Sequence, residues 1–460
     1  MSVTAEIARF ITTTKLKDIP ADVQEMAKGF VLDGVGVTLA GSTEKGSRII
    51  QAHVKELGGR PEAAILGTKL RAPARFAALA NGAAGHAMDH DDTQLTTTKE
   101  STYGLLTHPT IPVISAAMAL GDRMGASGKA ILHAYIVGVE VECRIADAIN
   151  PAHYREGFHS TATMGGFGAL AAAGVLLGLK EEAVQRGLGL VASMAGGLRE
   201  NFGTMTKPFH AGRAAENGVV AADLVRRGFT AAVNILEAKR GFYNATARGF
   251  DPAKIMGRLG KPYFLMSPGI SIKPYPSGSL SHPAQDVILS LVKQHDLKPD
   301  QIERIEVGTN SDIPNALIHN EPTTALQGKF SIPFCMAIAV LERKAGIAQF
   351  VDRKVRDPKT VDLMKRVRLY VDEEMERLGL DRARCIVKVT LRDGRVLTGR
   401  SDAARGMPEK PLGKEGLEEK FFDCAALVMK KAQARKAADL IWGLDRLANL
   451  RILIKDLKSA

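Results

Sequence analysis

The chain has 460 residues, of which 45% are hydrophobic and 24% charged, a composition typical of folded globular proteins. This length exceeds what one ordinary core organises, so we expect two domains. The formal net charge is +12, but the basic residues are scattered, with local density only near the C-terminus at Lys430, Lys431, Arg435 and Lys436. Without a basic stripe or a recognition motif, nucleic acid is not the expected partner.

The cysteines and the apolar segments exclude further classes. Four cysteines lie far apart with no CxxC pair, which argues against a disulfide framework or an iron–sulfur cluster. The N-terminal residues lack a charged region followed by an apolar run, so we expect no secretory signal and a cytoplasmic protein. Residues 161–179 are almost long enough to span a bilayer, but their Gly and Ala content favours a buried helix and no membrane attachment.

Helical periodicity dominates the chain up to about residue 265. The first clear apolar face runs from Val23 to Val31, behind Pro20 and a candidate N-cap at Asp22. Further helices are predicted over residues 75–88, 111–122, 129–149, 161–179, 181–194 and 211–227. The abundance of Gly and Ala predicts helices that approach each other closely.

The pattern changes between about residues 270 and 404. Alternating residues predict strands over 301–309, 366–372, 385–391 and 395–399, with a hairpin turn at Asp393–Gly394. Helical patterns at 283–294 and 330–343 lie among these strands, and helical spacing returns from Gly413. The predicted fold is therefore mainly α: an all-helical domain from 1–268 and 405–460, and a smaller α+β domain from 269–404.

The most unusual stretch is NGAAGHAMDHDDT, residues 81–93. His86 and His90 are four residues apart and would share one face of a helix, with Asp89 and two further aspartates adjacent, which is one pattern for a metal site. The alternative is a helix C-terminus that runs into a polar turn whose carboxylates bind neighbouring amides. Spacing alone leaves both interpretations open.

Three later segments place protonatable groups next to predicted helix starts. His108 lies in THP, and His159 precedes the Ser/Thr run of GFHSTAT, where a helix N-terminus would favour anions and lower a histidine pKa. GTMTKPFHAGRAA places Lys207 and His210 before a helix, and KPYPSGSLSHPAQD places Lys273 and His282 between the two domains. Each histidine alone is also compatible with a structural role. Gly166, Gly168 and Ala171 mimic a dinucleotide fingerprint, but no predicted strand precedes them. The sequence contains no nucleophile elbow and no phosphate-binding loop.

Taken in this order, the motifs resemble the MmgE/PrpD family, which includes 2-methylcitrate dehydratases, cis-aconitate decarboxylase and iminodisuccinate epimerase. The resemblance runs from VLDGVGVTLAG at residues 31–41 to LGKEGLEEKFFDC at residues 412–424. It implies a large all-helical domain with a smaller α+β lid domain, a homodimer, and a cleft that needs no cofactor and no metal. It also implies a small anionic carboxylic acid as substrate, and weighs against the metal interpretation of the Asp/His stretch.

The resemblance carries over residue by residue to the decarboxylase pocket. The matching positions are Asp89 and Thr93 of the DxDDT motif, His108, His159, Lys207, and Lys273 of the KxxP segment. Two positions depart from it. Ser277–Gly278 stands where the decarboxylase has a histidine, and Phe334 stands where it has a tyrosine. These departures weigh against cis-aconitate decarboxylation, and His282 is the candidate to replace the missing histidine.

We therefore expect a cofactor-independent lyase, a dehydratase similar to 2-methylcitrate dehydratase, that acts next to a carboxylate on a small di- or tricarboxylic acid. The expected catalytic residues are His159, His108, Lys207 and Asp89, and the expected substrate-binding residues are Thr93, Lys273 and His282. His159 and His108 would share acid and base duties, lysines would hold carboxylates, and Asp89 would orient an imidazole or a lysine.

Other functions remain open at this stage. Within the family, the alternatives are an epimerase of a polycarboxylate or a decarboxylase of an aconitate-type acid. A catalytically silent member and a metal-dependent hydrolase using His86, Asp89 and His90 are the alternatives from other classes. For the lyase, replacing Lys207 or His159 by Ala is expected to remove activity and leave the melting temperature nearly unchanged.

Overall fold

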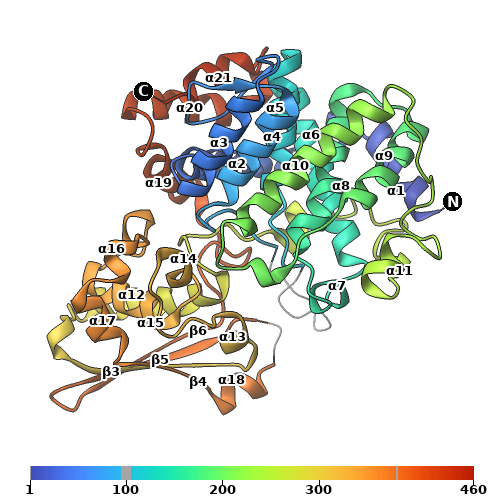
Figure 1. Cartoon of the computed structure of the whole chain (residues 1–460). Coiled ribbons are helices and arrows are strands. Elements are labelled where there is room, and N and C mark those ends of the chain that lie inside the picture. The colour runs from blue at the N-terminus through green and yellow to red at the C-terminus, as the bar shows by residue number, and fades with distance from the viewer. Residues whose placement is uncertain (1, 95–104, 380–381, 460) are drawn as a thin grey trace. The chain divides into compact units, whose positions relative to one another are not determined.

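The computed structural model describes residues 2–94, 105–379 and 382–459. The chain divides into two compact units. The first unit comprises Met1–Leu95, Gly104–Ile270 and Gly413–Ala460, and the second includes Ser271–Leu412. Helices dominate, and the one larger sheet belongs to the second unit, so the predicted mainly α fold with a small α+β part is confirmed (Figure 1).

The first unit draws its helices from both ends of the chain. They are α1 (Val3–Thr13), α2 (Ala21–Gly41), α3 (Lys45–Leu57), α4 (Ala74–His86), α5 (Thr110–Met124), α6 (Gly128–Asp147), α7 (Ala152–Arg155), α8 (Ser160–Leu177), α9 (Glu181–Met194), α10 (Thr206–Val225), α11 (Phe242–Ala247), α19 (Gly413–Ala425), α20 (Lys431–Trp442) and α21 (Arg451–Asp456). A two-residue pair, β1 (Ala63–Ala64) with β2 (Arg71–Ala72), interrupts this helical unit.

Helix α8 is the buried centre of the first unit. It packs against α5, α6, α9 and α10, and most of its residues are buried. It is long and apolar enough to cross a membrane, but 83% of its 18-residue window is buried inside the structure, as the sequence predicted. Small residues make this packing possible, since a Cβ added to Gly218 of α10 would lie 2.5 Å from the Cβ of Ala169.

The C-terminal segment completes the first unit by covering α2. Phe421 of α19 packs so closely that a Cβ added to Gly36 would lie 3.0 Å from its ring. Lys420 pairs with Asp33 of α2 at 2.5 Å, and both side chains are almost fully buried. The same ammonium donates to the backbone oxygen of His90 at 2.7 Å. Helix α19 therefore supports the turn that follows α4.

The second unit is built on a four-stranded sheet with the order β4-β3-β5-β6. Its strands are β3 (Ile302–Thr309), β4 (Val367–Val371), β5 (Cys385–Leu391) and β6 (Val396–Ser401), and its helices are α12 (His282–Gln294), α13 (Asp312–Ala316), α14 (Ala325–Gly328), α15 (Ile332–Glu342), α16 (Asp352–Val355), α17 (Pro358–Met364) and α18 (Glu373–Arg377). Strand β4 runs parallel to β3, whereas β5 pairs antiparallel with both β3 and β6. Helices α12 and α15 pack against this sheet over an apolar core.

The hairpin prediction is confirmed. β5 and β6 are antiparallel neighbours, and Gly394 adopts a φ of 87° in the turn between them. Only glycine takes up such a positive φ readily, because it lacks a Cβ. The Asp-Gly dipeptide therefore fixes the register of this edge of the sheet.

Most helix starts lie within two residues of the prediction, and two differences change the place of a side chain. Helix α2 begins at Ala21 with Pro20 as its N-cap, so Asp22 lies inside the first turn, where its carboxylate accepts from the amide of Val23 at 2.8 Å. Helix α10 begins at Thr206 rather than at residue 211. Lys207 therefore lies in the helix, and not on a loop before it.

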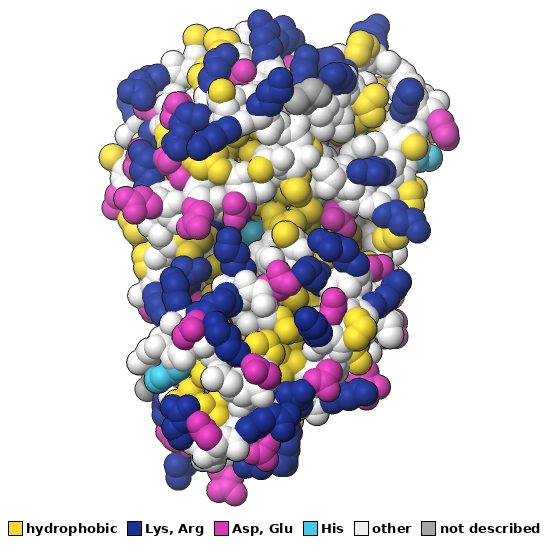
Figure 2. All heavy atoms as spheres, turned by 90° about the vertical axis from the view of Figure 1, so that its left-hand side faces the viewer, with side chains coloured by type: hydrophobic (Ala, Val, Ile, Leu, Met, Phe, Trp, Pro, Cys, Tyr) yellow, Lys and Arg dark blue, Asp and Glu magenta, His cyan; other side chains and the backbone are white. Residues whose placement is uncertain are grey.

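The surface charge is dispersed on the face that Figure 2 shows. Lys and Arg side chains alternate there with Asp and Glu side chains, and no single basic stripe crosses this face. This distribution agrees with the scattered basic residues of the sequence and with a net charge of +12.

Candidate active site

The turn after α4 carries the three aspartates of the site. The helix ends at His86, and Asp89 then adopts a left-handed conformation with a φ of 52°. Aspartate tolerates this conformation better than most residues. The predicted helix C-terminus running into a polar turn is therefore correct. The idea that His86 and His90 share a helix face is wrong, because the helix stops before His90.

Asp89 pairs with Lys207 across the first unit. One carboxylate oxygen lies 2.5 Å from the Lys207 ammonium, and each side chain is only 7% exposed. The Lys207 ammonium also lies 5.3 Å from the centre of the Phe202 ring. Because α10 starts at Thr206, the lysine sits in its first turn, where backbone amides favour an anion. This contact is compatible with one of the two roles expected from the sequence, the orientation of a lysine by Asp89, and that role stays a prediction.

Asp91 binds His86. Its two carboxylate oxygens lie 2.8 and 3.0 Å from Nδ1 of His86, and both side chains are completely buried. The same carboxylate lies 3.4 Å from Nδ1 of His108. Asp91 therefore holds an imidazole, which is the role that the sequence had offered to Asp89.

His108 lies immediately before α5 and is fixed by short contacts. Its Nδ1 donates to the backbone oxygen of Asp92 at 2.7 Å and lies 3.2 Å from the Thr93 hydroxyl. Its backbone amide donates to the hydroxyl of Thr161 at 3.0 Å. The Thr93 hydroxyl can therefore only accept from the Nδ1–H of His108, as a second and longer partner.

His159 forms the N-cap of α8, beside the N-terminus where the sequence placed it. Its backbone amide donates to the oxygen of Gly197 at 3.0 Å, and its Nδ1 lies 3.1 Å from Nδ1 of His210 on α10. One of these two nitrogens must carry the proton that the other accepts. The tautomers of His159 and His210 are therefore coupled.

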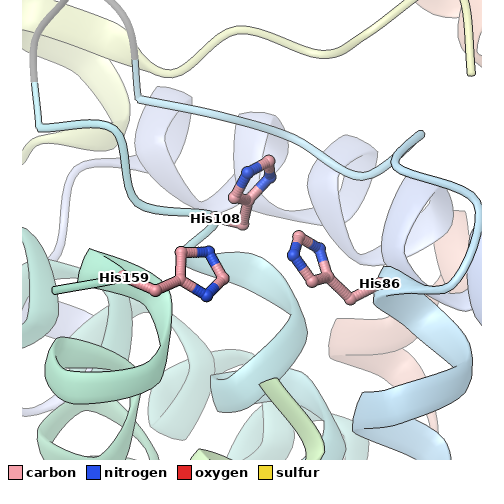
Figure 3. Close-up of side chains that lie close together, drawn as sticks. All are labelled: His86, His108 and His159. Atoms are coloured by element: carbon pink, nitrogen blue, oxygen red, sulfur yellow. The ribbon is translucent and has the colours of Figure 1, made fainter. Parts of the chain in front are cut away.

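Three imidazoles meet at the centre of this group (Figure 3). The ring of His86 lies 4.5 Å from that of His108 and 5.6 Å from that of His159, measured between ring centres. The rings come from α4, from the segment before α5, and from the start of α8. The fold thus assembles residues that are far apart in the sequence.

Burial opposes a positive charge on His86, His159 and His210. It lowers the pKa of His86, although the Asp91 carboxylate partly offsets this effect. Burial and the charge of Lys207 lower the pKa of His159 well below its ordinary value, and burial lowers that of His210 to about 4. Burial also raises the pKa of Asp92 well above its ordinary value, although Thr110 donates to its carboxyl. Neutral imidazoles beside one ammonium can accept protons and receive an anion.

The same group must be considered as a metal site. One nitrogen from each of His86, His108 and His159 falls within 4.8 Å of the others, as do atoms of His86, Asp89 and Asp91. A tetrahedral zinc site needs ligand atoms at about 2.0–2.2 Å from the ion, and residue types alone would allow these groups to provide them. The ammonium of Lys207 opposes a further cation. We assign no metal, and the expectation that none is required remains a prediction.

The structure brings five of the seven predicted site residues together. Asp89, Thr93, His108, His159 and Lys207 all belong to the first unit and meet around the turn after α4. Lys273 and His282 belong to the second unit. There, Lys273 is buried, and Nε2 of His282 lies 3.1 Å from the backbone oxygen of Ser277. Their role in substrate binding remains a prediction.

Sequence reasoning assigned no catalytic role to three members of the group, namely His86, Asp91 and His210. His86 entered only as a metal ligand, because its partner Asp91 is five residues away and meets it only through the left-handed turn at Asp89. The signal for His210 was its spacing of three from Lys207, which places both side chains on one face of a helix. That signal was hidden because the helix was predicted to start after both residues.

Two family models match the chain. The MmgE/PrpD N-terminal domain matches residues 5–254, and the MmgE/PrpD C-terminal domain matches residues 275–446. The cis-aconitate decarboxylase of Homo sapiens is 28% identical over 472 residues, which cover 100% of this chain and 95% of that protein. The cis-aconitate decarboxylase of Aspergillus terreus is 27% identical over 479 residues, 98% of this chain and 95% of that protein. The chain therefore belongs to the MmgE/PrpD family.

Proposed function

We propose that this protein is a lyase, independent of metals and organic cofactors, that acts next to a carboxylate on a small di- or tricarboxylic acid. The observation that carries the proposal is the buried group of three imidazoles beside the Lys207–Asp89 pair. The family membership and the names of the relatives support a lyase in particular.

The chemistry of such acids explains why these residue types are needed. Breaking a bond next to a carboxylate builds up negative charge on carbon and on the carboxylate oxygens. Lys207 and the N-termini of α8 and α10 would hold that charge, in surroundings with little water to screen it. Neutral histidines would move the proton, with His108 and His159 as the pair chosen from the sequence.

Two reactions are the main candidates. The relatives support decarboxylation of an aconitate-type acid, since they are cis-aconitate decarboxylases. The departures at Gly278 and Phe334 weigh against that reaction, and dehydration of a citrate-type acid is the first choice among the other reactions of the family. Phe334 is fully buried and packs edge-on against Phe350, 5.3 Å away, so it offers no hydroxyl. A Cβ at Gly278 would lie 3.0 Å from Leu317, so a histidine there would require that side chain to move.

Epimerisation of a polycarboxylate is the remaining candidate, because it needs proton transfer but no acid for a leaving group. We also propose a homodimer, on the family resemblance alone.

Proton NMR of the chelator-treated protein in D2O, with 2-methylcitrate, citrate, cis-aconitate and iminodisuccinate-type acids, tests the proposal. Decarboxylation would give a product with one carboxylate fewer, dehydration a new vinyl signal, and epimerisation α-proton exchange without net conversion. His159→Gln should abolish the reaction, whereas His53→Asn, at an exposed position, should not change it. No reaction with any acid, or activity that disappears with chelator and returns with metal, would contradict the proposal.

A further inference from the structure

The pair formed by His86 and Asp91 has no role in the proposed function so far. Its carboxylate–imidazole distances are 2.8 and 3.0 Å, and neither side chain has any exposed surface. Burying a carboxylate costs free energy unless a donor satisfies it. Solubility cannot explain a carboxylate that is completely buried at the centre of the site, so we expect it to have a role in the reaction.

The pairing determines the tautomer of His86. An ionised carboxylate only accepts hydrogen bonds, so Nδ1 of His86 carries the proton and donates it. In the neutral ring, Nε2 is then left with a lone pair. Nε2 is buried and has no hydrogen-bond partner among the residues that the structure describes. A carboxylate holds Nδ1 of this imidazole, and Nε2 is left to accept a proton. This is the arrangement of a general base.

The surroundings distinguish His86 from His159. Among the described residues, no carboxylate lies within ion-pair distance of His159, whose Nδ1 contacts the ring of His210 instead. The charges of Lys207, His86 and His210 all add to burial in opposing a proton on His159. His86 has the same ammonium nearby, but its direct partner is negative. A proton that enters this group is therefore better accommodated on His86.

We propose that His86 is a proton-transfer residue of this site and that Asp91 is its positioning residue, an inference that rests on the lyase function proposed above. In dehydration, Nε2 forms an N–H bond as the C–H bond next to the carboxylate breaks. The C–H electron pair becomes the second bond of the alkene. The hydroxyl leaves as water with the Nε2 proton of His108, which enters this step as an imidazolium beside Asp91 and leaves it as a neutral ring that keeps its Nδ1 proton. In decarboxylation, the C–C bond to the carboxylate breaks, CO2 leaves, and the carbon keeps the bonding pair. His86, which enters this step as an imidazolium, gives its Nε2 proton to that carbon and becomes neutral.

Several ionisable groups face His86 and bear on its titration. From the turn after α4 come Asp89 and Asp91, from the segment before α5 comes His108, from α8 comes His159, and from α10 come Lys207 and His210. Of these, Asp91 makes the direct contact.

The variant His86→Asn removes the group that transfers the proton and keeps the hydrogen bond to Asp91. The asparagine amide can still donate to Asp91 near the position of Nδ1, but nothing replaces Nε2. We expect kcat to fall by at least about 100-fold, the usual contribution of an acid–base group, with KM changed less than about threefold and the melting temperature close to that of the wild type. His53→Asn is the matched control and should keep full activity. Wild-type kcat in His86→Asn would overturn the proposal.

Asp91→Asn tests the positioning role through the pH profile. The Asp91 charge raises the pKa of His86 against the effect of burial. Removing it should lower that pKa, so the limb of the kcat/KM profile that reports His86 should move to lower pH as kcat falls. A fall in kcat with an unshifted profile would mean that Asp91 is only structural, and would overturn its assigned role.

The tautomer can be measured without any substrate. In protein labelled with ¹⁵N-histidine, the signals that disappear in His86→Asn belong to His86. Near neutral pH they should show a protonated Nδ1 and an unprotonated Nε2, and the opposite tautomer would overturn the proposal. If no acid in the panel reacts, the lyase function fails. If the wild type reacts and His86→Asn reacts equally well, only the role of His86 fails.

Discussion

Three aspartates within four residues do three different jobs. Asp89 faces Lys207, Asp91 faces His86, and Asp92 accepts from the hydroxyl of Thr110 at 2.5 Å. The left-handed backbone at Asp89 sends these side chains in different directions. Burial raises the pKa of Asp92, which favours its neutral form, whereas Asp89 has an ammonium at 2.5 Å. Asp89 and Asp91 therefore bind groups of the candidate site, whereas Asp92 ties the turn to Thr110.

The buried pair changes what we expect of a Lys207 substitution. Lys207→Met should abolish activity, and it should also destabilise the protein by about 3–5 kcal/mol, because Asp89 loses its counter-charge while only 7% exposed. The sequence alone had suggested an unchanged melting temperature. Chemical denaturation followed by circular dichroism measures the difference in unfolding free energy.

The double variant Asp89→Asn with Lys207→Met is the control for this prediction. It removes both charges, so it should recover part of the lost stability and none of the activity. Equal destabilisation in the single and double variants would mean that the pair does not determine the stability of this turn.

Helix α10 carries Lys207 and His210 and lies almost in backbone contact with α4, which ends at His86. A Cβ on Gly212 would meet the backbone oxygen of Leu79 at 2.2 Å. We predict that Gly212→Ala pushes the two helices apart, destabilises the protein by about 1–3 kcal/mol and lowers kcat. Steady-state kinetics would measure kcat, and thermal unfolding of the same preparation would measure the loss of stability.

Gly196→Ala is the control for Gly212→Ala. A Cβ added there meets nothing within 4 Å, although its neighbour Gly197 contacts the backbone of His159. Gly196→Ala should stay within about 0.5 kcal/mol of the wild type. If Gly212→Ala proves equally silent, the contact between α4 and α10 is not what positions the site.

The periodicity of apolar residues predicted where most helices and strands lie. It failed at element ends that depend on single residues such as proline. Glu181–Met194 and Cys385–Leu391 match their predicted bounds, because apolar spacing alone defines them. The start of α10 was missed because Pro208 reads as a helix breaker. Proline is tolerated in the first turn, where its missing amide would have no intrahelical partner.

The same distinction holds for the site. Motif order identified Asp89, Thr93, His108, His159 and Lys207, and the fold gathers them. The pairing of His86 with Asp91 depends on a single left-handed residue, and no periodicity encodes such a turn. The sequence motifs therefore predicted which residues lie at the site, and the backbone conformation determines which side chains pair.

At the scale of the whole molecule, the chain leaves a helical unit, builds a smaller one and returns. The second unit has its own apolar core, formed between its sheet and α12 and α15 by side chains such as Ile288, Phe334 and Val387. We therefore predict that a fragment of residues 271–412 folds alone and unfolds in one cooperative transition. A fragment without a cooperative melt or a protease-resistant core would contradict this.

Removing residues 413–460 should have the opposite effect on the first unit. The deletion takes the fully buried ring of Phe421 from α2 and leaves Asp33 buried without the Lys420 ammonium. Loss of a buried aromatic side chain costs about 3–5 kcal/mol, and stranding a buried charge costs a similar amount. Together these losses approach the whole stability of a typical domain, about 5–15 kcal/mol. The truncated chain should therefore lose the transition of the first unit in calorimetry. Limited proteolysis should then leave only the 271–412 core. Survival of both units would mean that α19 covers α2 without being needed to fold it.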